Sequence, residues 1–279
     1  MTSSESEKKF RRKRIPRPFL KWAGGKSQLL GPLLDTLPVF SGTYHEPFLG
    51  GGALFFELRP ENAVISDLND ELISCYKTVR DETEALVNLL STYKYDKAFY
   101  YETREKNPNR MSALHSAARM IYLNKTGFNG LYRVNSKGIF NVPMGRYKNP
   151  LICDPENLRE CSRILRNTTI ACRSFEMVVD DAKSGDLVYF DPPYIPLSKS
   201  SYFTAYEKGG FGKENQHLLA EVFTALDRCG VMVMLSNSDV PWIHEAYKPY
   251  NIRRIEASRL VNSNSTRRGK VGEVIVTNF

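Results

Sequence analysis

Short apolar segments separated by longer amphipathic ones constrain the fold of this chain more than any other feature. Four segments have the length and composition of buried strands: 62–67, 186–190, 231–235 and 273–276. Between them, apolar residues recur at helical spacing in three longer segments: 70–93, 112–124 and 214–229. Strands that alternate with helices in this way form a largely parallel sheet. The sequence therefore predicts an α/β fold.

The middle of the chain, at 69–175, is too long for a simple crossover between two strands. Its residues 125–150 interleave glycine and proline with aromatic and β-branched residues, a pattern typical of hairpins and long loops. We therefore expect a mostly helical insertion that contains a β-hairpin. The predicted division is a flexible basic tail at 1–17, an α/β domain at 18–68 and 176–279, and an insertion at 69–175.

The basic residues are concentrated in two places. The net charge is +8, of which residues 1–17 contribute +5. From Lys106 to Cys153 there is no acidic residue, whereas eight basic residues lie there: Lys106, Arg110, Arg119, Lys125, Arg133, Lys137, Arg146 and Lys148. Because a solvated surface normally mixes both signs, this acid-free run predicts a polyanionic partner. A merely basic surface is the alternative.

The cysteine and histidine patterns argue against disulfides and metal sites. Five scattered cysteines without a C-x-x-C spacing predict free, buried thiols in a reducing cytoplasm. The four histidines lack ligand spacing, so we expect no metal. We also expect neither a signal peptide nor a membrane span, because no apolar run is long enough. The expectation is a monomeric cytoplasmic protein of a prokaryote, associated with the nucleoid, or of a phage.

A run of three glycines, Gly50–Gly52, follows the apolar strand end at 46–49. Glycines at such a point let a ligand approach the backbone closely and let a helix begin at once. Asp67 lies about twenty residues further on, at the end of another strand, where an acid binds ribose hydroxyls in nucleotide-binding folds. The spacing does not match a phosphate-binding loop. A tight structural turn with a helix-capping Asp67 is the alternative.

The sequence Asp191-Pro192-Pro193-Tyr194 directly follows a buried strand. Two prolines stop the strand and fix a rigid turn, so a carboxylate, a carbonyl and an aromatic ring are presented together. This set suits a planar base with an amino group: Asp191 and the Pro192 carbonyl can accept its two N–H bonds, and Tyr194 can stack on the base. A chance turn is the alternative explanation for the four residues alone.

Several motifs, in the same order, give the chain a resemblance to the Dam-type DNA adenine-N6 methyltransferases (D12 class, group alpha) from about residue 18 onward. These motifs lie at 19–26, 46–56, 66–69, 191–198, 203–206, 235–239 and 263–267. The resemblance implies a Rossmann-like methyltransferase sheet with an inserted DNA-recognition module, and S-adenosylmethionine as cofactor. The cofactor-binding residues that it implies are Trp22, Lys26, Glu46, Phe48, Gly50, Gly52, Asp67 and Asp191.

The resemblance also assigns the insertion and its neighbour Lys21 to double-stranded DNA. It implies that Phe128 and Asn129 enter the base stack; Phe128 stands where many members of the family have a tyrosine, so it can stack but lacks the hydroxyl. The residues that it implies as readers of base edges are Lys21, Leu131, Arg133 and Pro143, with Tyr147 as a helper. Phosphate contacts are expected from Asn141, Arg146 and Lys148.

The resemblance implies direct methyl transfer to N6 of an adenine that is flipped out of the duplex. The expected target is GATC, because Lys21, Leu131, Arg133 and Pro143 match the base readers of GATC enzymes. Asp191, Pro192, Pro193 and Tyr194 would form the catalytic turn. The turn at 191–194 alone does not distinguish this reaction from methylation of cytosine N4 or of an RNA base, because amino methyltransferases share the turn. A catalytically silent DNA-binding protein, such as a repressor, is the alternative outside the enzymes.

Overall fold

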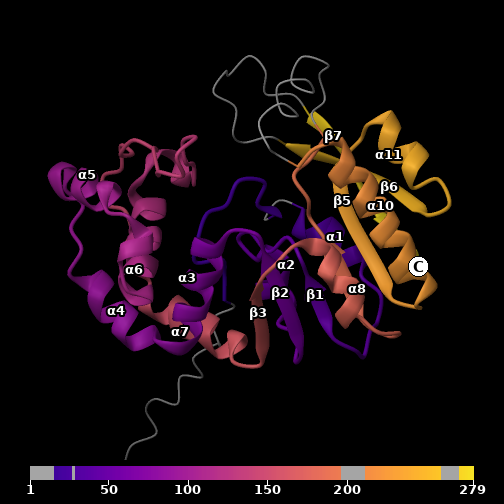
Figure 1. The fold of residues 1–279 in the computed structure, drawn as a ribbon, viewed down its shortest axis with the longest axis horizontal. Coiled ribbons are helices and arrows are strands. Elements are labelled where there is room, and N and C mark those ends of the chain that lie inside the picture. The colour runs from indigo at the N-terminus through magenta and orange to yellow at the C-terminus, as the bar shows by residue number, and fades with distance from the viewer. Residues whose placement is uncertain (1–15, 27–28, 196–210, 259–269) are drawn as a thin grey trace, which may run out of the picture.

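A computed structural model describes residues 16–26, 29–195, 211–258 and 270–279 of the protein. In this part of the chain, seven strands form one sheet in the order β3-β2-β1-β4-β5-β7-β6 (Figure 1). The strands are β1 (Tyr44–Glu46), β2 (Ala63–Asp67), β3 (Thr168–Cys172), β4 (Leu187–Phe190), β5 (Met232–Ser238), β6 (Asn251–Ser258) and β7 (Lys270–Thr277). Strands β1 to β5 pair in parallel, and β7 is antiparallel to both β5 and β6.

The order of the strands locates the functional part of the sheet. Strand β1 pairs with β2 on one side and with β4 on the other. Strands β2 and β3 therefore extend the sheet from β1 in one direction, and β4 and β5 extend it in the opposite direction. In open α/β sheets, ligands bind at such a switch point, outside the carboxyl ends of the strands. The glycine turn follows β1 and the turn at 191–194 follows β4, so the topology brings both motifs to this point.

The helices divide between the sheet and a lobe beside it. In the described part of the chain they are α1 (Leu30–Thr36), α2 (Ala53–Leu58), α3 (Asp70–Asp81), α4 (Thr83–Ser91), α5 (Lys97–Glu105), α6 (Ala113–Thr126), α7 (Pro155–Leu165), α8 (Val178–Asp181), α10 (Lys213–Arg228) and α11 (Pro241–Ala246). Helices α4, α5 and α6 lie away from the sheet, at the left of Figure 1. The segment that follows α6 lies at the upper end of this lobe.

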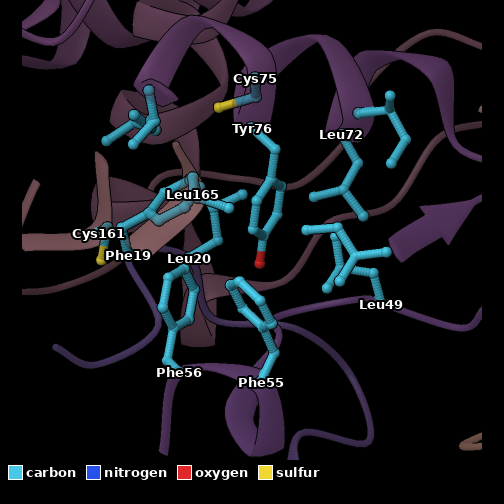
Figure 2. Close-up of a cluster of buried hydrophobic side chains, with 14 of the residues drawn as sticks. Phe19, Leu20, Leu49, Phe55, Phe56, Leu72, Cys75, Tyr76, Cys161 and Leu165 are labelled. Atoms are coloured by element: carbon cyan, nitrogen blue, oxygen red, sulfur yellow. The ribbon is translucent and has the colours of Figure 1, made fainter. Parts of the chain in front are cut away.

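Strand β4 separates two clusters of buried apolar side chains in the described structure. Leu187 and Tyr189 belong to the cluster that includes α2, α3 and α6, whereas Val188 and Phe190 belong to the cluster that includes α8, α10 and α11. This alternation follows from the two-residue period of a strand. Both faces are covered, which explains why β4 is apolar throughout. In Figure 2, Tyr76 of α3 lies at the centre of the first cluster.

The α/β fold class is confirmed, and several details differ from the expectation. The helix expected at 70–93 is broken at Glu82 into α3 and α4. Across the hairpin expected at 125–150, the described structure has two isolated antiparallel bridges, Gly127 to Met144 and Val134 to Phe140, in place of two regular strands. Strand β3 pairs with β2, so the sheet takes a strand from inside the range assigned to the insertion.

All five cysteines are free, but burial was predicted wrongly for two of them, because Cys172 and Cys229 are exposed. Parts of several motifs lie outside the described residues: most of the tail at 1–17, and the segments 196–198, 203–206 and 263–267.

None of the helices in the described ranges is long and apolar enough to cross a membrane. A group of three or more His, Cys, Asp or Glu side chains placed to hold a metal is likewise absent from those ranges.

Candidate functional site

The glycine turn after β1 is held in a conformation that only glycine adopts easily. Gly50 and Gly52 have φ values of +47° and +63°, in the left-handed region. A Cβ atom at Gly50 would lie 2.7 Å from Cδ1 of Trp22, so the indole covers the turn closely. The backbone of Gly50 donates to Asp67 (3.0 Å), and its carbonyl accepts from the Tyr76 hydroxyl (3.2 Å). Two expected cofactor residues, Trp22 and Asp67, therefore meet at this turn.

Asp67 ends β2 beside the glycine turn. Its Oδ2 accepts the Gly50 N–H, and its Oδ1 accepts the Asn69 N–H at 2.9 Å. Burial raises the pKa of Asp67, and these backbone N–H groups oppose that rise. Each carboxylate oxygen keeps a second lone pair, so Asp67 can still accept the hydroxyl groups of a ribose. The residues present thus fit the nucleoside part of S-adenosylmethionine.

Asp191 follows β4 and is the centre of a polar cluster. Its Oδ1 lies 2.7 Å from Nζ of Lys26 and accepts a hydrogen bond from Ser236 Oγ at 3.0 Å. Burial raises the pKa of Asp191, and the Lys26 cation and the Ser236 hydroxyl oppose that rise by stabilising the carboxylate. The Lys26 ammonium also lies 4.3 Å from the centre of the Tyr194 ring, in cation–π contact. Lys26, Asp191 and Tyr194 therefore form one site.

Two other expected cofactor residues lie in different surroundings. Glu46, at the end of β1, is 3% exposed and accepts a hydrogen bond from the Tyr44 hydroxyl at 2.7 Å. Burial raises its pKa to about 8, with a further contribution from the charge of Asp191, so Glu46 is mostly protonated at neutral pH. Phe48 is half-buried and stacks on Phe175 with ring centres 5.2 Å apart. It therefore extends an apolar wall from the glycine turn.

The loop after α6 brings the expected base-stack and base-edge residues together. Phe128 is 49% exposed, and the neighbouring Asn129 has a left-handed φ of +55° in a short 3₁₀ turn. The Phe128 N–H donates to the carbonyl of Pro143 at 2.9 Å, which holds the two halves of the loop side by side. Arg133 is exposed, and its Nε donates to Asn141 Oδ1 at 2.7 Å. This pairing orients the guanidinium group.

The expected outer reader, Lys21, is joined to the same loop. Its ammonium lies 5.6 Å from the centre of the Tyr147 ring, and the Tyr147 hydroxyl donates to the Gly127 carbonyl at 3.1 Å. Leu131 is partly buried against the core, whereas Arg146 is exposed. The ten residues expected to contact DNA therefore lie in the loop at 127–150 and at the adjacent Lys21.

Two residues of the acid-free run are not part of an exposed basic surface. Arg119 is 2% exposed and binds Glu71, with N–O separation 3.0 Å, inside the lobe. Lys125 is half-buried, and burial, together with the nearby charges of Lys21 and Arg17, lowers its pKa to about 8. The interpretation of the whole run as a surface that binds a polyanion is therefore wrong for Arg119, whose charge pairs with the carboxylate of Glu71.

The family of the chain follows from its match over residues 22–261 to the family described as D12 class N6 adenine-specific DNA methyltransferase. The chain belongs to this family. It is therefore a DNA adenine-N6 methyltransferase, and adenine is favoured over the cytosine alternative. Membership implies S-adenosylmethionine as the methyl donor and DNA as the substrate.

Curated relatives match the methyltransferase over nearly its whole length. The type II methyltransferase M1.LlaDCHI of Lactococcus lactis subsp. cremoris is 49% identical over 94% of this chain and 95% of its own. The type II methyltransferase M.MjaIII of Methanocaldococcus jannaschii is 41% identical, over 94% of this chain and 99% of its own. The DNA adenine methylase of Escherichia coli (strain K12) is 35% identical, over 93% and 94%.

Asn124 has a structural role in this methyltransferase that the sequence did not indicate. Asn124 of α6 is 2% exposed, and its amide accepts from the Lys21 N–H and donates to the carbonyls of Lys21 and Gly130, all at 2.8–2.9 Å. It thus ties the segment that carries Trp22 to the loop at 127–150. An Asn on a buried helix face was the available signal, but one of its two partners, Lys21, lies 103 residues away in sequence.

Proposed function

We propose that this methyltransferase transfers the methyl group of S-adenosylmethionine directly to N6 of an adenine that it flips out of duplex DNA, within the sequence GATC. The observation that supports this most is the cluster of Asp191, Lys26 and Tyr194 at the switch point of the sheet, beside the glycine turn. It combines the acceptor, the cation and the aromatic ring that an amino-bearing base and a charged cofactor require.

In this proposal, the cofactor residues divide by chemistry. Asp67 binds the ribose hydroxyls, Lys26 binds the carboxylate of the methionine part, and Trp22 closes the glycine turn. Glu46 and Phe48 line the same region. When bound, S-adenosylmethionine supplies an electrophilic methyl group.

The residues of the catalytic turn hold the adenine amino group for the transfer. The Asp191 carboxylate and the Pro192 carbonyl accept its two N–H bonds, which directs the nitrogen lone pair away from them. Tyr194 stacks on the base; its hydroxyl donates to Glu273 at 2.9 Å, which sets the plane of the ring. Orientation of two reactants can lower a barrier by as much as roughly 7–11 kcal/mol, so no covalent intermediate on the protein is required.

The DNA contacts in this proposal come from the loop at 127–150 and Lys21. Phe128 and Asn129 are exposed at its beginning, directly after α6, and fill the space that the flipped base leaves in the stack. Arg133, oriented by Asn141, is suited to a guanine edge in the major groove, and Arg146 to a phosphate. Helices α3 to α7 and this loop then act as the target-recognition region.

The experiment that tests the reaction replaces Asp191 by alanine. Methylation of duplex DNA, measured by transfer of labelled methyl groups, should fall by at least about 10²–10³-fold, whereas DNA affinity, measured by fluorescence anisotropy, should remain. Asp180→Ala, an exposed acid on α8, is the matched control and should keep full turnover. An Asp191→Ala protein with wild-type turnover would contradict the proposed role of the turn.

The target sequence is tested separately. Sequencing of methylated sites in a host without its own adenine methyltransferase should show N6-methyladenine at GATC. This expectation depends on the resemblance of Lys21, Leu131, Arg133 and Pro143 to the base readers of GATC enzymes. Enrichment at a different sequence would refute GATC and leave the reaction itself standing.

A further inference from the structure

Strand β5 ends in three consecutive polar residues that are buried. Ser236, Asn237 and Ser238 follow the apolar residues Val233–Leu235, and each of the three is 0% exposed. A buried hydroxyl or amide without a hydrogen-bond partner destabilises a fold. Their partners therefore reveal what these residues do.

All three side chains bind the catalytic turn or the residue after it. Ser236 Oγ donates to Asp191 Oδ1 at 3.0 Å. Asn237 Oδ1 accepts the N–H of Ile195 at 3.3 Å, and Ser238 Oγ donates to the carbonyl of Ile195 at 2.8 Å. The end of β5 thus contacts the turn at both its first residue and the residue that follows its last.

Gln216 of α10 completes this network from the other side. It is 2% exposed and occupies the same helical face as Leu219, Phe223 and Leu226, where an apolar residue would be expected. Its Nε2 donates to the Pro193 carbonyl at 3.1 Å, and its Oε1 accepts from Asn237 Nδ2 at 3.3 Å. Gln216 and Asn237 therefore form a buried amide pair that holds the backbone from Pro193 to Ile195.

The chemistry of the turn explains why it needs such a pair. Pro192 and Pro193 have no N–H, so this part of the chain cannot be fixed by donating hydrogen bonds to a neighbouring strand. We propose that Gln216 and Asn237 are positioning residues for the methyl-transfer step, because they fix the peptide groups on either side of Tyr194. Through that backbone they set the direction of the Pro192 carbonyl and of the Tyr194 ring. This inference rests on the proposed function.

The test is Gln216→Met, which keeps the length of the side chain and removes both amide hydrogen bonds. A displacement of about 1 Å at a reacting centre can cost about 10²-fold in rate, so the single-turnover rate should fall by about that factor. The KM for DNA and the Kd for S-adenosylmethionine should stay within about twofold. Leu219→Met, one turn further along the same buried face, is the matched control and should keep the wild-type rate.

A second variant separates positioning from packing. In Gln216→Glu, the protonated side chain can donate to the Pro193 carbonyl, whereas the ionised one cannot. The rate of this variant relative to wild type should therefore recover as the pH is lowered, and that of Gln216→Met should not. The double variant Gln216→Met with Asn237→Ala should lose little more than either single variant, since the two amides act as a unit.

The possible outcomes are distinct. If Asp191→Ala keeps wild-type turnover, the proposed function itself fails. If Asp191→Ala loses turnover and Gln216→Met, shown to be folded by circular dichroism, keeps its single-turnover rate, the positioning role is refuted. A pH-independent ratio for Gln216→Glu would refute it as well.

Discussion

The acid-free run contains one arginine whose removal should affect folding far more than DNA binding. Arg119 of α6 is 2% exposed and uses its guanidinium fully: Nη1 binds Glu71 at 3.0 Å, Nε donates to the Thr103 carbonyl at 3.1 Å, and Nη2 donates to the Arg104 carbonyl at 2.9 Å. Arg119→Met keeps the aliphatic part of the side chain and removes all three contacts.

The expected magnitude follows from what remains buried. Glu71, with 14% side-chain exposure, keeps the Tyr132 hydroxyl as a donor at 2.9 Å but loses its counter-charge. Removing one partner of a buried ion pair typically costs about 3–5 kcal/mol. Because a domain is stabilised by only about 5–15 kcal/mol in total, Arg119→Met should lower the free energy of unfolding by a large fraction.

The matched control makes the same substitution at an exposed position of the same run. Arg146→Met should change the free energy of unfolding by no more than about 0.5 kcal/mol, and it should reduce the slope of log affinity against log salt by about one. Urea unfolding followed by circular dichroism measures the first quantity, and fluorescence anisotropy over a salt series measures the second. The reasoning is refuted if Arg119→Met stays within about 1 kcal/mol of wild type, or if it lowers the salt slope as Arg146→Met does.

Three further predictions concern the active site and the recognition loop. Burial raises the pKa of Glu46 from 4.5 to about 8, so between these pH values the folded protein keeps a proton that the unfolded chain releases. The free energy of unfolding should therefore fall as the pH rises from 4.5 to about 8. Urea titrations should show that Glu46→Gln flattens this fall. Gly50→Ala places a Cβ 2.7 Å from Trp22 at a left-handed φ, so calorimetry should show at least about tenfold weaker binding of S-adenosylmethionine. The control is Gly138→Ala, at φ +73° with no atom near the added Cβ. It should cost about 1–2 kcal/mol of stability and leave the binding of S-adenosylmethionine unchanged. Phe128→Ala should keep the free energy of unfolding within about 0.5 kcal/mol of wild type, because Phe128 is 49% exposed. It should weaken the fluorescence increase that base flipping gives with 2-aminopurine at the target position. An unchanged fluorescence increase would exclude Phe128 from base flipping.

The parts of the fold that could be predicted from the sequence are those with a strong local signal. Strand β4 is apolar throughout, and β2 and β5 begin as apolar runs, because both faces of the sheet are covered. The reversal of strand order between β1 and β4 then brings the glycine turn and Asp191 to one place, and the resemblance had assigned both to the cofactor. Strand β3 has a weaker signal, because Ile170 is its only large aliphatic residue, and it was assigned to the insertion.

The candidate site shows the same division between local and long-range information. Asp191, Tyr194 and the glycine turn are recognisable because proline and glycine impose their backbone geometry through sterics alone, independent of distant contacts. Lys26, Ser236, Gln216 and Asn124 each contact at least one partner far away in sequence, at separations of 23 to 165 residues.

Charge is the feature that the sequence described least well. The same acid-free run contains the exposed Arg146 and the buried Arg119, and no local pattern separates them. Burial depends on which segments pack together, and the free energy of a charge depends on burial and on its partner far more than on its neighbours in sequence. The sequence by itself therefore determined the strands β2, β4, β5 and β7, the two turns and the chemistry that these turns present. Only the tertiary structure decided which basic residues stabilise the lobe and which polar residues hold the catalytic turn, because both depend on contacts between distant segments.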